Sequence, residues 1–190
     1  MQVKFRRSGL SRFVAGCVAA VAVADIGAHV ARAEPAATDR PPVAIGGWRY
    51  EKGTNDVYLF HCEAAACVAG SKVSYRFYAP GTTVTFAQYR SEQELVIKAL
   101  QQRAPPGTTI KIVAIEGDQT DTGPRMYKSR RLTVSADGSQ EHVHSGILLG
   151  EKASVSLISS SRDEKAAAGG FSLYALALML VAQGAPGPKQ

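Results

Sequence analysis

Alternating apolar and polar residues predict two strands in the first half of the chain. In KVSYRFY, the side chains of Val73, Tyr75 and Phe77 alternate with Ser and Arg. A period of two is typical of a strand with one buried face. The preceding stretch VYLFHC alternates in the same way. We therefore expect strands over 57–62 and 72–78.

A helical pattern follows. Thr85 and Gln88 have the spacing of a capping box, in which each side chain satisfies a backbone amide at the helix start. Proline and glycine at 105–107 end the pattern, since proline cannot continue the helical hydrogen bonds. The sequence thus predicts a helix over 85–103 and then a buried strand over 109–115. The apolar stripe of the helix comprises Tyr89, Val96, Ala99 and Leu100.

The segment 125–160 has the pattern of three strands joined by tight turns. Asp137-Gly138 separates the first two apolar runs, and Asp-Gly favours a two-residue hairpin turn. Gly150-Glu151 separates the second from the third. We expect an antiparallel meander here.

The last apolar run, FSLYALALMLVA at 171–182, predicts a buried helix, with strand as the alternative because Gly169-Gly170 interrupts the pattern. Ser161 and Glu164 have capping-box spacing just before it. The predicted fold class is α+β: an antiparallel sheet of about six strands, packed on one face by two helices, with one disulfide. The predicted core residues are Phe86, Tyr89, Leu100, Val155, Leu157, Phe171 and Leu176.

The N-terminus has the three parts of a secretory signal peptide. Four basic residues precede the uncharged run at 13–24, and Ala31-Arg32-Ala33 forms an A-x-A cleavage site. The run is shorter than the roughly 20 residues that span a bilayer. We expect cleavage between Ala33 and Glu34. A lipid anchor on Cys17 is the alternative, but only four residues separate this cysteine from Arg12.

The rest of the chain is long enough for one domain with a core. We expect a signal peptide over 1–33, a flexible leader over 34–44, a single domain over 45–183 and a disordered tail over 184–190. Without residues 1–33 the chain has 17 basic and 15 acidic residues, so its net charge is +2 rather than +6. The high pI therefore gives no support for nucleic-acid binding. We expect no transmembrane segment in the mature chain.

Cys62 and Cys67 are the two cysteines that remain after cleavage. Thioredoxin-type redox sites use Cys-x-x-Cys, whereas four residues intervene here. A structural zinc site needs four ligands, and His61 with the two cysteines supplies three. In an oxidising compartment the expected outcome is a disulfide between them, closing a loop between strands.

Histidines and basic residues supply the other candidate sites. His142 and His144 lie two apart on a predicted strand, so both point to one face, and His61 is a possible third ligand for copper or zinc. The alternative is a polar outer face. The densest basic patch comprises Arg125, Lys128, Arg130 and Arg131. It could meet anionic lipid, sugar acids or an acidic partner, or it could be a solvated strand.

The layout resembles the invasion-associated locus B family of exported bacterial proteins. The features that match are the signal peptide, the early Gly47-Trp48, the following cysteine pair, and Gly170, Phe171, Ala177 and Leu178 near the C-terminus. The resemblance implies a small, disulfide-bonded, β-rich domain of the envelope without established catalysis. The chain departs from the family pattern in lacking a second cysteine pair and in its predicted helix over 85–103.

The sequence thus predicts a periplasmic or secreted binding domain that is not an enzyme and needs no cofactor. Its ligand stays open, as does its partner, which is either an envelope component or another protein. Two alternatives belong to other classes. One is a metal-binding protein centred on His142 and His144. The other is a cell-envelope hydrolase, which would need two facing carboxylates in a pocket.

Overall fold

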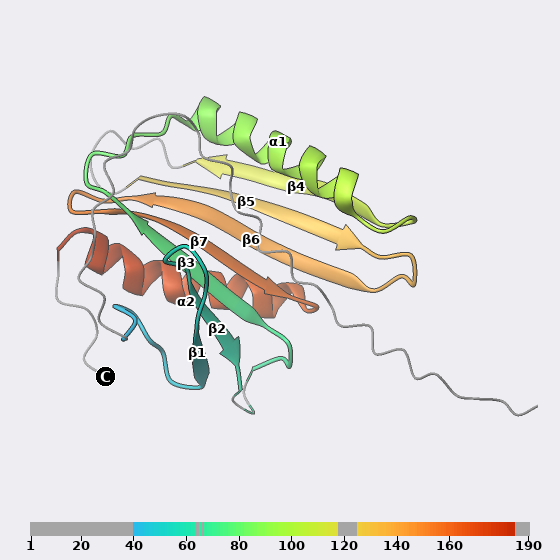
Figure 1. Ribbon diagram of the computed structural model, residues 1–190, viewed down its shortest axis with the longest axis horizontal. Helices are drawn as coiled ribbons and strands as arrows, with labels where there is room; N and C mark the ends of the chain where they lie inside the picture. Colours follow the sequence, from blue (N-terminus) through green and yellow to red (C-terminus); the bar gives the residue numbers. More distant parts are fainter. Residues whose placement is uncertain (1–39, 64, 66, 118–124, 185–190) are drawn as a thin grey trace, which may run out of the picture.

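The computed structural model describes residues 40–63, 65, 67–117 and 125–184. The predicted signal peptide, its cleavage site at Ala33 and Glu34, most of the leader and the end of the tail lie outside these ranges. The described part folds as one antiparallel sheet and two helices (Figure 1). In chain order the elements are β1 (Trp48–Lys52), β2 (Tyr58–Cys62), β3 (Lys72–Tyr78), α1 (Phe86–Arg103), β4 (Thr109–Gly117), β5 (Arg125–Val134), β6 (Gln140–Leu149), β7 (Ser154–Ser161) and α2 (Glu164–Ala182).

The predicted α+β class is confirmed. Within the described ranges the sheet has seven strands in the order β1-β2-β3-β7-β6-β5-β4. The chain leaves the middle of the sheet after β3, crosses through α1 to the far edge at β4, and returns through the β4–β7 meander. The strand β1 was not anticipated, because five residues with three charges do not show an apolar period.

The two helices cover opposite faces of the sheet, so the prediction that both pack on one face is wrong. Tyr127 of β5 contacts Phe86 and Tyr89 on α1, with ring centroids 5.5 and 5.8 Å apart. Three residues along the strand, Arg130 reaches Glu164 at the start of α2. Successive strand residues point to opposite faces, so α1 and α2 are separated by the sheet (Figure 1). Side chains on both faces of β5 are therefore in contact with a helix. The sequence pattern of this strand does not indicate this.

The helix starts follow their capping residues. Thr85 caps α1 in the predicted capping box with Gln88. The cap of α2 is Asp163, whose carboxylate accepts a 2.7 Å hydrogen bond from the Ala166 amide, and not Ser161 as predicted. Ser161 is still paired with His142 as the last residue of β7. A residue held in the sheet cannot also begin the helix.

The main core lies between α2 and the β3–β7–β6 part of the sheet. Of the predicted core residues, Tyr89, Val155, Leu157 and Phe171 are buried, and Phe86 and Leu100 are half-buried. Leu176 is 69% exposed, so that prediction is wrong: it lies on the outer side of α2. Val43 lies within the predicted flexible leader over 34–44, but it is buried in the core, so this part of the leader prediction is wrong.

The C-terminus of α2 is fixed to the β6–β7 turn. The carbonyl of Ala182 accepts hydrogen bonds from the amides of Lys152 and Ala153, at 2.8 and 3.2 Å. These bonds satisfy a carbonyl that has no partner within the helix. By length and composition α2 could span a bilayer. In this fold Tyr174 and Leu178 on its inner side are fully buried against the sheet.

Candidate binding surface

The two helices leave one half of each sheet face uncovered. On the α2 side, α2 packs on β3, β7 and β6, while β5 and β4 extend beyond it. The strand register aligns side chains there in rows, because residues paired across strands share a face. We call this surface the open half-face. It comprises Lys111, Val113, Glu116, Lys128, Arg130, Leu132, His142, His144 and Glu164.

Charged groups form a chain across the open half-face. The Lys128 ammonium lies 2.8 Å from a Glu116 carboxylate oxygen. Arg130 lies between two carboxylates, 3.9 Å from Glu116 and 3.6 Å from Glu164. Both distances are longer than a hydrogen bond, and all four side chains are between 39% and 58% exposed. The pairs therefore contribute little to stability, and solution ligands can reach them.

The Lys128 hydrogen bond, aided by the charges of Lys128 and Arg130, lowers the pKa of Glu116 below its usual value. The carboxylate is therefore ionised across the neutral range. Its negative charge balances part of the positive charge of Lys128 and Arg130 beside it.

A shallow hollow adjoins these charges. It is lined by Lys111, Ile112, Val113, Leu132, His142 and Glu164. A bulge in β4 between Ile112 and Ala114 turns Val113 outward, where it is 50% exposed. The hollow therefore combines apolar walls with a lysine, a histidine and a carboxylate at its rim.

His144 lies on the open half-face next to α2. Its ring lies 6.1 Å from that of Phe171. Burial lowers the pKa of His144, and the nearby charges of Arg130, Lys128 and His142 lower it further, while Glu164 raises it. At neutral pH the imidazole therefore carries less positive charge than an ordinary histidine.

The lowered pKa of His144 predicts a pH dependence of stability. Below the ordinary histidine value of about 6.5, the unfolded chain binds a proton that the folded protein resists. The free energy of unfolding should therefore decrease as the pH drops below that value. The His144→Gln variant should show a flatter decrease. Urea unfolding at a series of pH values measures both slopes, and equal slopes would show that His144 makes no contribution.

The predicted basic patch is divided between the two faces of the sheet. Lys128 and Arg130 lie on the open half-face, whereas Arg131 alternates to the α1 side. Burial lowers the pKa of Arg131, which lies near Tyr89 and Glu141. Arg125 is at the opposite end of β5, beside the β6–β7 turn. The four residues do not form a single site.

His61 does not join His142 and His144. It pairs with Lys72, which aligns through Ser160 with Val143, so His61 lies three strands away and on the opposite face. A metal site using all three histidines is therefore wrong. Within the described residues no three His, Cys, Asp or Glu side chains are grouped as metal ligands would be.

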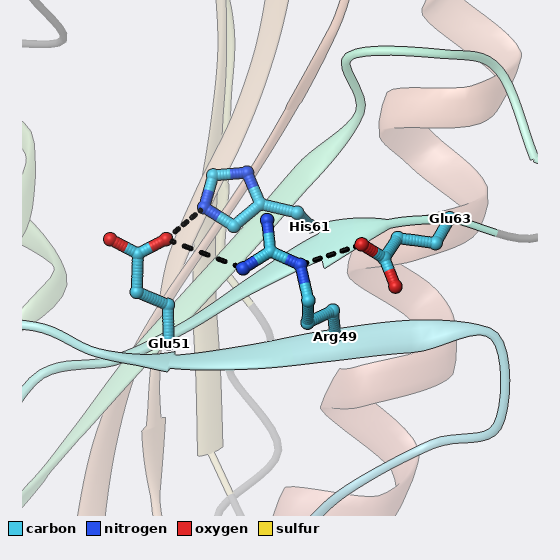
Figure 2. A network of polar contacts seen from close by, with 4 residues as sticks. All are labelled: Arg49, Glu51, His61 and Glu63. Carbon is cyan, nitrogen blue, oxygen red and sulfur yellow. Dashed lines mark hydrogen bonds and ion pairs between the residues drawn. The ribbon is translucent and has the colours of Figure 1, made fainter.

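His61 belongs instead to a surface network on the β1–β2 hairpin (Figure 2). Its Nε2 lies 3.1 Å from a Glu51 oxygen. Arg49 donates a 2.6 Å hydrogen bond to Glu63 and lies 4.0 Å from Glu51. Arg49, Glu51 and Glu63 are about half exposed and His61 is 25% exposed, so these pairs contribute little to stability.

Cys62 and Cys67 form the predicted disulfide, with their Cα atoms 6.0 Å apart. It closes the loop between β2 and β3. Because the enclosed loop is short, it should stabilise the fold by only about 2 kcal/mol. Such a bond fits a protein exported to an oxidising compartment.

A buried polar cluster lies under α1. Ser129 and Ser145 have their hydroxyl oxygens 2.8 Å apart, and Ser129 donates to Gln93 at 2.9 Å. Tyr89 donates to the Ser145 carbonyl at 3.1 Å. The cluster is closed by α1 and attaches this helix to the sheet. Burial raises the pKa of Tyr89, so its hydroxyl stays protonated.

Sequence reasoning missed Glu116 and Glu164 as members of the surface. Glu116 comes to Lys128 through the β4–β5 register after the bulge, and Glu164 through the start of α2. Neither position follows from a local sequence pattern.

No family model and no curated protein matches this chain. Among solved structures, the solution structure of cyanobacterial PsbP (CyanoP) from Synechocystis sp. PCC 6803 is similar, with 11% identity and a TM-score of 0.45. The similarity covers 70% of this chain and 92% of that one. A likeness of this size carries no function from one protein to the other.

Proposed function

We propose that this chain is an exported, non-catalytic binding domain whose ligand surface is the open half-face. The observation that carries this proposal is the α2-side face of β4 and β5, which neither helix covers, and where Lys128 and Arg130 lie near Glu116 beside a hollow. The positive charges of Lys128 and Arg130, on partly exposed side chains, suit an anionic ligand. Next to them lie the apolar side chains of Val113 and Leu132. They suit a ligand that also has apolar surface, such as the C–H faces of the sugar rings in an acidic polysaccharide.

The arrangement of the carboxylates favours binding over hydrolysis. Glu116 and Glu164 flank Arg130, which resembles the facing pair that a glycoside hydrolase would need. A general acid, however, requires a pKa raised by burial. The pKa of Glu116 is lowered, and Glu164 is 58% exposed. Charge pairing with Arg130 is the simpler role of both groups.

Export is tested by the intact mass of the protein recovered from the periplasm or medium of a bacterial host. We expect a chain that begins at Glu34 and is two hydrogens lighter than the reduced form, because of the Cys62–Cys67 disulfide. Thiol-blocking reagents should not add mass until the protein is reduced. An uncleaved chain, a lipid on Cys17, or free thiols in the native protein would contradict export as proposed.

Ligand binding is tested by retention on immobilised heparin, used here as a sulfated polysaccharide probe. The Lys128→Gln/Arg130→Gln double variant should elute at clearly lower salt than the parent, since two cations are lost from the surface. The control is Lys98→Gln/Arg103→Gln on α1, which changes the net charge equally and should elute later than the first variant. Equal elution of the two variants would show that only net charge matters.

The membership of the invasion-associated locus B family stays a prediction. It is supported by the disulfide after the early tryptophan, since Trp48 pairs with Cys62 across β1 and β2. The same residue packs edge-on against Tyr174 of α2, with ring centroids 5.6 Å apart. The segment around Trp48 and the helix α2, which both carry the resemblance, therefore pack against each other.

A further inference from the structure

The outer side of α2 carries a stripe of exposed leucines. Leu173, Leu176 and Leu180 are 47%, 69% and 41% exposed. They account for three of the seven exposed large hydrophobic residues in the described ranges, and the other four lie on α1, β4, β7 and the loop between β2 and β3. The inner side of the same helix packs on the sheet through Tyr174 and Leu178. We call the three residues the leucine stripe.

The spacing of the leucine stripe is that of a helix–helix contact. Steps of three and four residues give the 3.5-residue period at which helices pair side by side. The stripe continues to Gly169 by another step of four. A Cβ at Gly169 would meet no atom within 4 Å, so this end of the outer face is open and allows close approach of a second backbone.

The distribution of charged residues on and before α2 shows which kind of partner suits the leucine stripe. No Asp, Glu, Lys or Arg occurs between Ala166 and Gly184, so the stripe has no charge for a polar partner to meet. The four residues 162–165 before it, Arg-Asp-Glu-Lys, have no net charge. Helices that lie on membranes usually have an excess of Lys and Arg beside their apolar face. A lipid surface is therefore a poor match.

We propose that the leucine stripe binds the same stripe of a second copy of this chain, in an antiparallel, two-fold symmetric dimer. A two-fold interface needs a patch that complements itself. In the antiparallel arrangement Leu173 of one copy lies opposite Leu180 of the other, and the two Leu176 side chains lie near the axis. An uncharged stripe brings no like charges together in this arrangement.

The size of the contact predicts a weak dimer. A stable interface typically buries about 800 Å² on each partner. Three leucines that are 47%, 69% and 41% exposed supply only part of that area. The dimer should therefore form in a concentration-dependent way, and it does not depend on the ligand proposed for the open half-face.

Sedimentation velocity of the purified protein, from low micromolar to near-millimolar concentration, tests the proposal. We expect a shift from monomer toward dimer, and at least about a tenfold weaker association for Leu176→Glu. The control Leu95→Glu changes the most exposed leucine of α1, at 66% exposure, and should associate as the parent does. A parent that is monomeric throughout would overturn the proposal.

Cysteine cross-linking gives a second readout that does not depend on the affinity. Leu176→Cys should form a disulfide-linked dimer under mild oxidation, because the two copies of this position face each other at the axis. Leu95→Cys should not. Equal cross-linking of both variants would overturn the proposal. It would also be overturned if the parent does not self-associate but floats with lipid vesicles, and Leu176→Glu does not float.

Discussion

Tyr75→Phe is expected to lower the free energy of unfolding by about 2–3 kcal/mol. The Tyr75 hydroxyl donates a 2.7 Å hydrogen bond to the Val43 carbonyl and accepts a 3.1 Å bond from the Val43 amide. Both residues are 1% exposed. The substitution would leave a buried amide and a buried carbonyl without these partners, which costs more than the bonds contribute on balance.

Tyr174→Phe provides the matched control for this prediction. Tyr174 lies in the same core and its ring contacts that of Tyr75. Its hydroxyl is buried and has no hydrogen-bond partner among the residues that the structure describes, so removing it relieves a desolvation cost. We expect no loss of stability, or a gain of up to about 1 kcal/mol. Chemical denaturation of the two variants gives both values, and an equal loss in each would refute this view of the core.

Gly150→Ala is expected to destabilise the protein by about 3 kcal/mol or more. A Cβ at Gly150 would lie 2.5 Å from the carbonyl oxygen and 2.7 Å from the carbonyl carbon of Ala182. These are backbone atoms, so they cannot rotate away. Moving them would stretch the two hydrogen bonds that the Ala182 carbonyl accepts from Lys152 and Ala153.

Gly46→Ala separates this steric effect from the general cost of replacing glycine. A Cβ at Gly46 would meet nothing within 4 Å, so we expect a change within about 0.5 kcal/mol. Thermal or urea unfolding of both variants provides the comparison. A Gly150→Ala protein as stable as Gly46→Ala would show that the β6–β7 turn does not hold the end of α2.

The sequence correctly predicted those helices, strands and turns that are decided by the spacing of apolar, capping and turn residues close together in the chain. The helix at α1 begins at the predicted Thr85 cap. A tight turn forms at Asp137-Gly138, with Gly138 at a φ of 81°, but its loop has three residues rather than the predicted two, because the Ser135 amide donates a 2.9 Å hydrogen bond to the Ser139 carbonyl. The helix at 171–182 is also confirmed. In each case residues close in sequence decide the conformation, so the sequence alone is sufficient.

Features set by tertiary pairing could not be predicted. The position of α2 on the face opposite α1 depends on which side of β5 each helix packs, and both sides of that strand have suitable residues. The residues at 171–182 are apolar all round the helix, so the sequence pattern does not show whether Leu176 faces the sheet or the solvent. The same limit explains the divided basic patch, since Arg130 and Arg131 are adjacent in sequence but lie on opposite faces.

The charged surface shows how function depends on this tertiary level. Lys128 and Arg130 were identified from the sequence as basic residues, but their carboxylate partners come from β4 and α2. Only the β4–β5 register and the start of α2 bring Glu116 and Glu164 to them. The sequence is sufficient to select the basic residues as candidates. It does not show which carboxylates lie beside them, so it does not predict the site.

The most direct test of the open half-face as the ligand surface is a heparin-oligosaccharide titration followed by backbone amide NMR shifts. We predict that the largest shifts fall on β4, on β5 around Lys128–Leu132, and at the start of α2 near Glu164, and that they weaken as salt is added. Shifts confined to the opposite face, around His61 on the β1–β2 hairpin, would contradict the proposal. So would the absence of shifts at low salt.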